Sequence, residues 1–115
     1  YVDERGTFAE ILKTKDSGQF SFFTVSPGVT RGSHYHHSKV EKFCVVRGAA
    51  RLCYRLIGCE DIHEINVSGT NLQIVDTIPG WTHDISNIGK DEVLVLVWAN
   101  EIFDRKNPDT ISQKV

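Results

Sequence analysis

Four side chains with metal-binding chemistry are concentrated in two segments of the sequence. His34, His36 and Glu41 lie close together, and His83 follows much later in the chain. Neutral imidazoles and a carboxylate suit Zn, Fe, Mn, Ni and Co, provided that the ligand atoms converge on one point. The residue types therefore predict a site for one divalent metal ion.

Such a site needs β-strands that are distant in the sequence and adjacent in space. Residues i and i+2 of a strand face the same side, so His34 and His36 should project together while Tyr35 points away. Glu41 follows a short turn, at the head of the next strand, and His83 comes from a separate hairpin. This arrangement favours a β-barrel with the metal site inside it.

The rest of the sequence is typical of one all-β domain. A chain of 115 residues that is 40% hydrophobic is long enough for one packed core and not for two. Turn formers separate short apolar, β-branched runs, as in sandwiches and barrels. We expect strands over residues 20–25, 42–46, 51–57, 62–67, 72–75 and 92–98. No segment predicts a helix of three turns, and residues 107–110 predict a turn followed by one helical turn or none.

Charge and hydropathy argue against two classes of partner. The net charge of −2, without a basic block, disfavours nucleic acid. The longest apolar run, residues 93–99, is too short to span a bilayer, and no signal-like segment opens the chain. We therefore expect a cytoplasmic protein without a membrane partner, whose three cysteines are reduced. The sequence has no Met, which favours a domain excerpted from a longer protein.

The two ligand segments resemble the two motifs of the cupin superfamily. The first motif, G-x5-H-x-H-x3–4-E-x6-G, is matched at every interval by Gly28, His34, His36, Glu41 and Gly48. The second motif, G-x5-P-x-G-x2-H-x3-N, is matched by Gly80, His83 and Asn87, although Ile78 stands in its Pro position. The resemblance implies a double-stranded β-helix, or jelly-roll barrel, over residues 1–115, with the metal near its mouth.

Residues 3–10 and 29–35 are similar to segments of the dTDP-4-keto-sugar 3,5-epimerases. In that family, the matching positions contact the sugar nucleotide, which here implies substrate binding by Arg5, Glu10 and Arg31. The family's lysine falls on Glu41, and its later catalytic Tyr falls in residues 93–97, where there is none. Its base would be His34, which here has the position of a metal ligand. The acid and base of these epimerases therefore do not transfer.

Residues 3–6, 12–14, 41–43, 98–104 and 107–110 resemble the C-terminal cupin domain of the CapF/WbjC family of bifunctional capsular polysaccharide and O-antigen enzymes. That resemblance implies zinc and epimerisation at C3 of a UDP-2-acetamido-2,6-dideoxy-4-hexulose, a UDP-activated 4-keto-6-deoxy amino sugar. It also implies a separate N-terminal short-chain dehydrogenase domain that reduces C4 with NADPH. Nothing in this chain resembles a dinucleotide-binding loop.

An epimerase of this kind needs a base for the C3 proton and a group that stabilises the enolate. The stabiliser could be the metal or a cation such as Lys13. The base could be Lys13, Tyr35 or His37, and strand parity disfavours Tyr35. Lys13 and His37 are thus the predicted catalytic residues, while Trp81, expected in a turn beside His83, would line the pocket mouth. Arg5 and Arg31 suit the diphosphate, and Glu10 the uridine or sugar.

Two other functions fit the same ligands. One is a metal-dependent dioxygenase, which would need iron and consume O2. The other is a non-catalytic cupin that binds sugar or metal and regulates a partner domain, with a structural zinc. The Arg-Gly segments favour the epimerase over both. Because cupin barrels pair through strands, we also expect a homodimer.

Overall fold

Eleven β-strands and no helix make up the computed structural model, which describes residues 1–115. The strands are β1 (Val2–Asp3), β2 (Gly6–Lys13), β3 (Gln19–Val25), β4 (Thr30–Tyr35), β5 (Glu41–Arg47), β6 (Ala49–Leu56), β7 (His63–Ser68), β8 (Ile74–Thr77), β9 (Trp81–Asn87), β10 (Val93–Ala99) and β11 (Ile111–Ser112). Each of the six predicted runs overlaps a strand, which confirms the all-β prediction. No helix has the length and apolar character needed to cross a bilayer.

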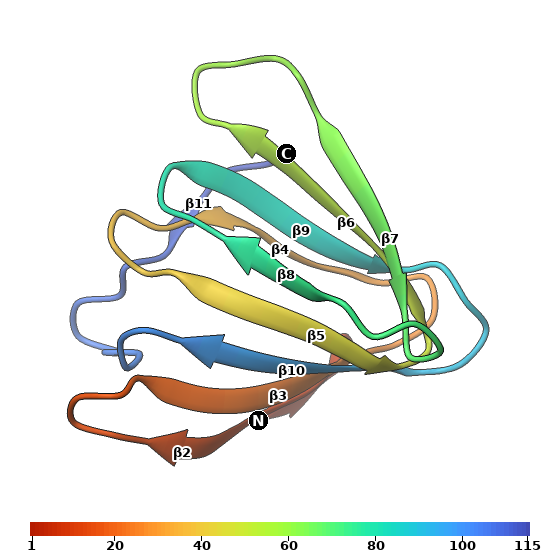
Figure 1. The fold of residues 1–115 in the computed structure, drawn as a ribbon, viewed down its shortest axis with the longest axis horizontal. Coiled ribbons are helices and arrows are strands. Elements are labelled where there is room, and N and C mark those ends of the chain that lie inside the picture. Colours follow the sequence, from red (N-terminus) through yellow and green to blue (C-terminus); the bar gives the residue numbers. More distant parts are fainter.

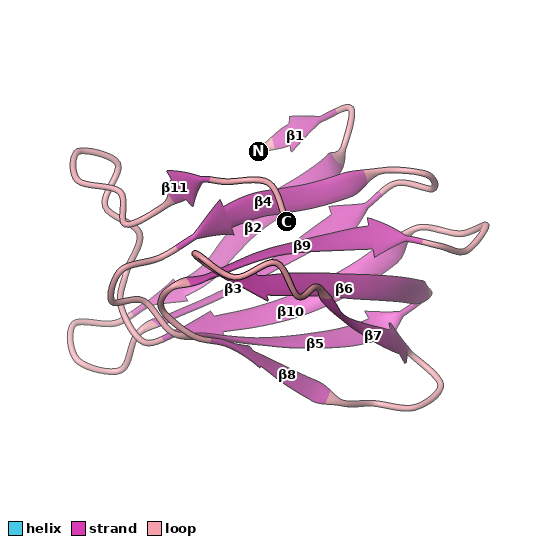
Figure 2. Ribbon diagram, turned by 90° about the horizontal axis from the view of Figure 1, so that it is seen from above, coloured by secondary structure: helices cyan, strands magenta, loops and turns pink.

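The strands form two antiparallel sheets that face each other (Figures 1 and 2). One has the order β1-β2-β3-β10-β5-β8, and the other has the order β11-β4-β9-β6-β7. Several neighbours are far apart in the sequence: β10 lies between β3 and β5, and β9 lies between β4 and β6. This crossing topology is the jelly-roll barrel of the cupins, as predicted.

The apolar core fills one end of the barrel. Val25, Val93 and Val95 are fully buried there, with Phe23, Phe43, Val45, Ala50, Leu52, Val67, Ile85 and Val97 packed around them. β-Branched side chains fit the pleated inner faces of both sheets. Glu41 pairs with Ala99 at the other end of β5 and β10, so the start of β5 is left for polar side chains.

Two local features differ from the sequence-based expectation. Trp81, expected in a turn, is the first residue of β9. The segment after residues 107–110 has no helical turn, which the prediction allowed, but it contains an unexpected short strand, β11, that pairs with β4. In β9, Thr82, His83 and Asn87 are buried although they are polar, so the strand lacks the apolar alternation that would have announced it.

Candidate metal centre

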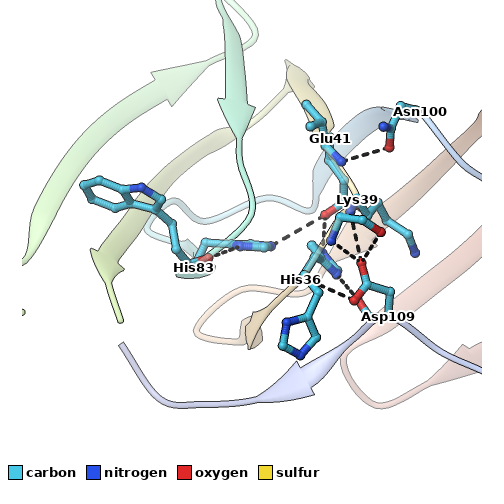
Figure 3. A network of polar contacts seen from close by, with 10 residues as sticks. His36, Lys39, Glu41, His83, Asn100 and Asp109 are labelled. Atoms are coloured by element: carbon cyan, nitrogen blue, oxygen red, sulfur yellow. Dashed lines mark hydrogen bonds and ion pairs between the residues drawn. The ribbon is translucent and has the colours of Figure 1, made fainter. Parts of the chain in front are cut away.

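The four predicted ligands meet where β4 ends and where β5 and β9 begin. Their potential ligand atoms, from His34, His36, Glu41 and His83, all lie within 4.8 Å of one another. Glu41 Oε1 lies 2.8 Å from His36 Nε2 and 3.7 Å from His83 Nε2 (Figure 3). The structure thus assembles one cluster of three imidazoles and a carboxylate from segments that are distant in the sequence.

A β-bulge in β4 sets the direction of the His34 side chain. The pairing of β4 with β9 shifts between Gly32 and His34, and Ser33 has a φ of 61°. As a result, Arg31 pairs with Ile85 and His34 pairs with His83, two residues of β9 that share the inner face. Without the extra residue, Arg31 and His34 would face opposite sides of the sheet. The bulge therefore brings a cation and a metal ligand into one interior.

The chain segment after β10 orients His36. The Nδ1–H of His36 donates to the main-chain carbonyl of Asp109, which leaves Nε2 facing Glu41. The Asp109 carboxylate accepts from the backbone amides of His37, Ser38 and Lys39 at 2.8, 2.8 and 2.9 Å (Figure 3). A ligand histidine whose second nitrogen is held in this way has a fixed tautomer and a fixed ring plane. The sequence analysis assigned Asp109 only to a turn.

His83 is held in the same way as His36, with Nδ1 bonded to a main-chain carbonyl and Nε2 facing the cluster. Its Nε2 atom shows best whether a metal ion fits this site. Its Nδ1 lies 3.3 Å from the Trp81 carbonyl, which accepts the Nδ1 proton. Its Nε2 is buried and has no hydrogen-bond partner. A buried nitrogen lone pair without a donor is costly unless a ligand satisfies it. This orphaned atom, facing a carboxylate and two other imidazoles, has the donor chemistry of a site for a divalent metal.

Burial and mutual contacts set the protonation of the cluster. Burial, with smaller contributions from the neighbouring imidazoles, lowers the pKa of His34 to about 4, and burial also lowers the pKa of His83. Burial opposes the charge on His36, but its contacts with Glu41 and the Asp109 carbonyl outweigh this and raise its pKa. Burial likewise opposes ionisation of Glu41, but His36 holds the pKa of that carboxyl low. The metal-free cluster thus holds an ion pair and two neutral imidazoles.

Cavities adjoin the cluster on two sides. One, of about 320 Å³, is lined by His34, His36 and Glu41 together with Arg31, Lys39 and Glu101. We call it the ligand cavity. The other, of about 420 Å³, lies beyond His83 and is mostly apolar, and Trp81 and Tyr54 form part of its wall. Their rings lie 5.7 Å apart between centroids. Trp81 therefore lines a pocket beside the cluster.

Arg31 is a half-buried cation without an anionic partner. Its guanidinium lies 5.3 Å from the centroid of the Phe23 ring, and its Nη1 is buried without a hydrogen bond. Burial lowers the pKa of this guanidinium, although an arginine stays charged at any physiological pH. Arg5 lines a smaller cavity of about 200 Å³ with Arg31, but it is exposed and pairs with Asp3 at 2.6 Å. Of these two arginines, Arg31 is thus the one without an anionic partner.

Sequence comparison identifies the group of proteins to which this fold and site belong. The profile of the polysaccharide biosynthesis C-terminal domain matches residues 1–111. The chain belongs to this family. A relative from Pseudomonas aeruginosa, named UDP-2-acetamido-2,6-beta-L-arabino-hexul-4-ose reductase, is 60% identical over 115 residues, which are 100% of this chain and 31% of the relative.

Solved structures agree with this family assignment. The capsular polysaccharide assembling protein CapF from Staphylococcus aureus is similar over 100% of this chain and 31% of its own, with a TM-score of 0.98 and 43% identity. Oxalate decarboxylase from Lactobacillus farciminis covers 97% of this chain with a TM-score of 0.73 and 19% identity, which supports the cupin fold alone. This chain spans about a third of the length of its family relatives.

Three predicted site residues of this family member line none of the three cavities beside the cluster. Glu10 and Lys13 form an exposed ion pair of 3.1 Å on β2, and Lys13 lines only an outer hollow that it shares with Lys39 and Glu101. His37 is exposed, and its ring lies 5.8 Å from that of Tyr35. The catalytic roles assigned to Lys13 and His37, and the binding role of Glu10, stay predictions.

Sequence reasoning missed two residues that line the ligand cavity, Lys39 and Glu101. Lys39 lies between two metal-binding positions of the first motif, but only the fold shows that it is buried. Glu101 falls in a segment that was noted only for its resemblance to the CapF/WbjC family. No spacing rule connects it with the ligands.

Proposed function

We propose that this domain epimerises C3 of a UDP-2-acetamido-2,6-dideoxy-4-hexulose in the synthesis of capsule or O-antigen precursors. The observation that carries the proposal is the cluster of three imidazoles and a carboxylate that shares a cavity with the unpaired cation Arg31. Membership in a polysaccharide biosynthesis family supports it. So does the name of the Pseudomonas relative, which contains a UDP-linked 2-acetamido-hexul-4-ose.

The reaction needs a polarised ketone and a bound diphosphate. The proton on C3 is removed, its bonding electrons move into a C3–C4 double bond and onto the C4 oxygen, and a proton returns to the opposite face. His34, His36, Glu41 and His83 would hold the metal, which in that position supplies Lewis-acid polarisation of the ketone. We propose Zn2+, since this donor set suits it. Arg31 contributes a fork of N–H donors for a phosphate oxygen pair.

Other parts of the proposal concern the substrate and the protein's context. Arg5 would contact the diphosphate from the rim, Glu10 the uridine or sugar, and Trp81 would offer an apolar ring face. A separate short-chain dehydrogenase domain would then reduce C4 with NADPH, and the protein would act as a cytoplasmic homodimer. These assignments rest on the family resemblance.

Deuterium exchange tests the proposed reaction directly. The chain would be incubated with the UDP-linked 4-ketohexosamine in D2O, and loss of the C3 proton signal would be followed by NMR. We expect deuterium at C3, loss of exchange after chelation, and recovery with Zn2+. Circular dichroism of the chelated chain separates a catalytic metal from one that only holds the fold.

Absence of exchange by the folded, metal-loaded chain would overturn the proposal. In that case, binding of the sugar nucleotide without turnover would indicate a regulatory cupin. Consumption of O2 by the iron-loaded chain would instead indicate a dioxygenase.

A further inference from the structure

Lys39 is a buried lysine without an anionic partner. The residue is only 5% exposed, and none of the ion pairs in the structure includes it. Its Nζ lies 5.2 Å from the centroid of the Phe103 ring. A buried ammonium is costly unless an anion compensates it, and a cation–π contact repays only part of that cost. The position of Lys39 therefore indicates that its charge is compensated by an anion that the chain itself does not supply.

The ligand cavity leaves room for such an anion, because the buried neutral side chains of its wall, Gln19 and Ser21, are already paired. Gln19 Nε2 donates to Ser21 Oγ at 2.9 Å, and Gln19 Oε1 accepts from the Phe103 amide at 3.0 Å. The cavity wall also includes Glu101, which accepts from Ser38 Oγ at 3.2 Å. Lys39 and Glu101 are thus a buried cation and a carboxylate that line the ligand cavity without pairing to each other.

We propose that Lys39 stabilises the enolate oxygen and that Glu101 accepts the C3 proton, an assignment that rests on the proposed epimerase function. Glu101 takes the proton and becomes a neutral carboxylic acid, while the C–H electron pair forms the C3–C4 double bond. The C4 oxygen becomes the enolate oxygen that Lys39 faces. Water then protonates C3 on the opposite face, and the hydroxide formed takes the proton back from Glu101. Lys39 takes no part in the proton transfer.

Because Lys39 is buried, we place it at the enolate oxygen and not at the diphosphate. A preformed charge in a water-excluded site contributes most where substrate charge appears only in the transition state. The diphosphate is charged before and after the reaction, and the exposed Arg5 and half-buried Arg31, which both line the smaller cavity beside the cluster, are available for it. Lys39 is more deeply buried than either arginine, and it lines the ligand cavity together with His34, His36 and Glu41.

The experiment compares Lys39→Met and Glu101→Gln with wild type in the C3 exchange assay. For Lys39→Met we expect kcat to fall about 100- to 1,000-fold with little change in KM. For Glu101→Gln we expect a fall of about 100- to 10,000-fold. Lys39→Met should also raise the melting temperature of the ligand-free chain by about 4 to 10 °C, because an uncompensated buried charge is removed. Lys90→Met and Glu92→Gln, exposed at the opposite end of the barrel, are the matched controls.

Several results would overturn the inference. They are exchange by Lys39→Met at the wild-type rate, an effect on KM alone, or a lower melting temperature, which would indicate a structural lysine. If Lys13→Met lost the C3 exchange while Lys39→Met kept it, the stabilising cation would be Lys13, as predicted from the sequence. No exchange by wild type would instead refute the proposed function itself, so the two failures are distinguishable.

Discussion

Replacing Asp109 tests whether the segment after β10 holds the metal site in shape. In Asp109→Ala, three backbone amides of residues 37–39 lose their carboxylate acceptor. Each lost bond at this partly exposed loop costs about 1 kcal/mol, since water replaces the acceptor imperfectly, so the total is about 2 to 4 kcal/mol. The Asp109 carbonyl, which fixes the tautomer of His36, loses its anchor at the same time.

Two measurements follow from this estimate. The melting temperature of the metal-free chain should fall by about 8 to 15 °C, at about 4 °C per kcal/mol for a domain of this size. The affinity for Zn2+, measured by competition with a chelator of known strength, should fall about 10- to 100-fold, as for other losses of support to a ligand histidine. Asp109→Asn should be intermediate, because an amide oxygen in the Oδ2 position still accepts from Ser38 and Lys39 while the NH2 group faces the His37 amide donor.

Asp61→Ala is the control, because Asp61 is an exposed loop carboxylate far from β4 in the sequence. The reasoning is refuted if Asp109→Ala matches this control in both melting temperature and Zn2+ affinity. A fall in stability without a change in affinity would show that the loop contacts matter but that His36 keeps its orientation without them.

Four further predictions concern protonation, the bulge and the anion site. Folding lowers the pKa of His34 from 6.5 to about 4. The free energy of unfolding of the metal-free chain should therefore fall by up to about 3 kcal/mol as the pH falls from 6.5 to 4. In chemical denaturation, His34→Gln should lose less stability than wild type over the same pH range. Zn2+ must displace the proton of His36, so calorimetry of Zn2+ binding in buffers of different ionisation enthalpy should show proton release. The Zn2+ affinity should then rise between about pH 6 and 8, and an affinity that does not rise would contradict this prediction. Gly32 has a φ of +100°, and a Cβ there would lie 2.9 Å from the His83 carbonyl oxygen. Gly32→Ala should therefore cost about 1 to 3 kcal/mol of stability and weaken Zn2+ binding. Unchanged stability and Zn2+ affinity would show that the bulge is not required. Arg31→Met should weaken UDP binding in titration calorimetry about 10-fold or more while leaving the melting temperature close to wild type; equal affinity would remove Arg31 from the anion site.

Much of the fold could be predicted because the strands carry their own signals. The β-branched runs around Val45 and Val95, separated by turn formers, indicate strands without any knowledge of their partners. β9 was harder to see because its buried positions include Thr82, His83 and Asn87. His83 and Asn87 face the interior, because Asn87 bonds main-chain carbonyls at one end of the strand and His83 belongs to the cluster at the other. Thr82 lies on the opposite face, where its hydroxyl donates to the Gln113 carbonyl.

The sequence by itself determined which residues have metal-binding chemistry and that a β-barrel must gather them. Residue type and spacing are local properties, so His34, His36, Glu41 and His83 could be recognised in advance. The tertiary structure alone decided what surrounds them. Burial of Lys39, the carbonyl of Asp109 on His36 and the bulge that turns Arg31 inward all depend on segments that meet only after folding. Desolvation and hydrogen-bond partners are set by those distant segments, and they decide which cations stay unpaired and which nitrogens face the candidate metal site.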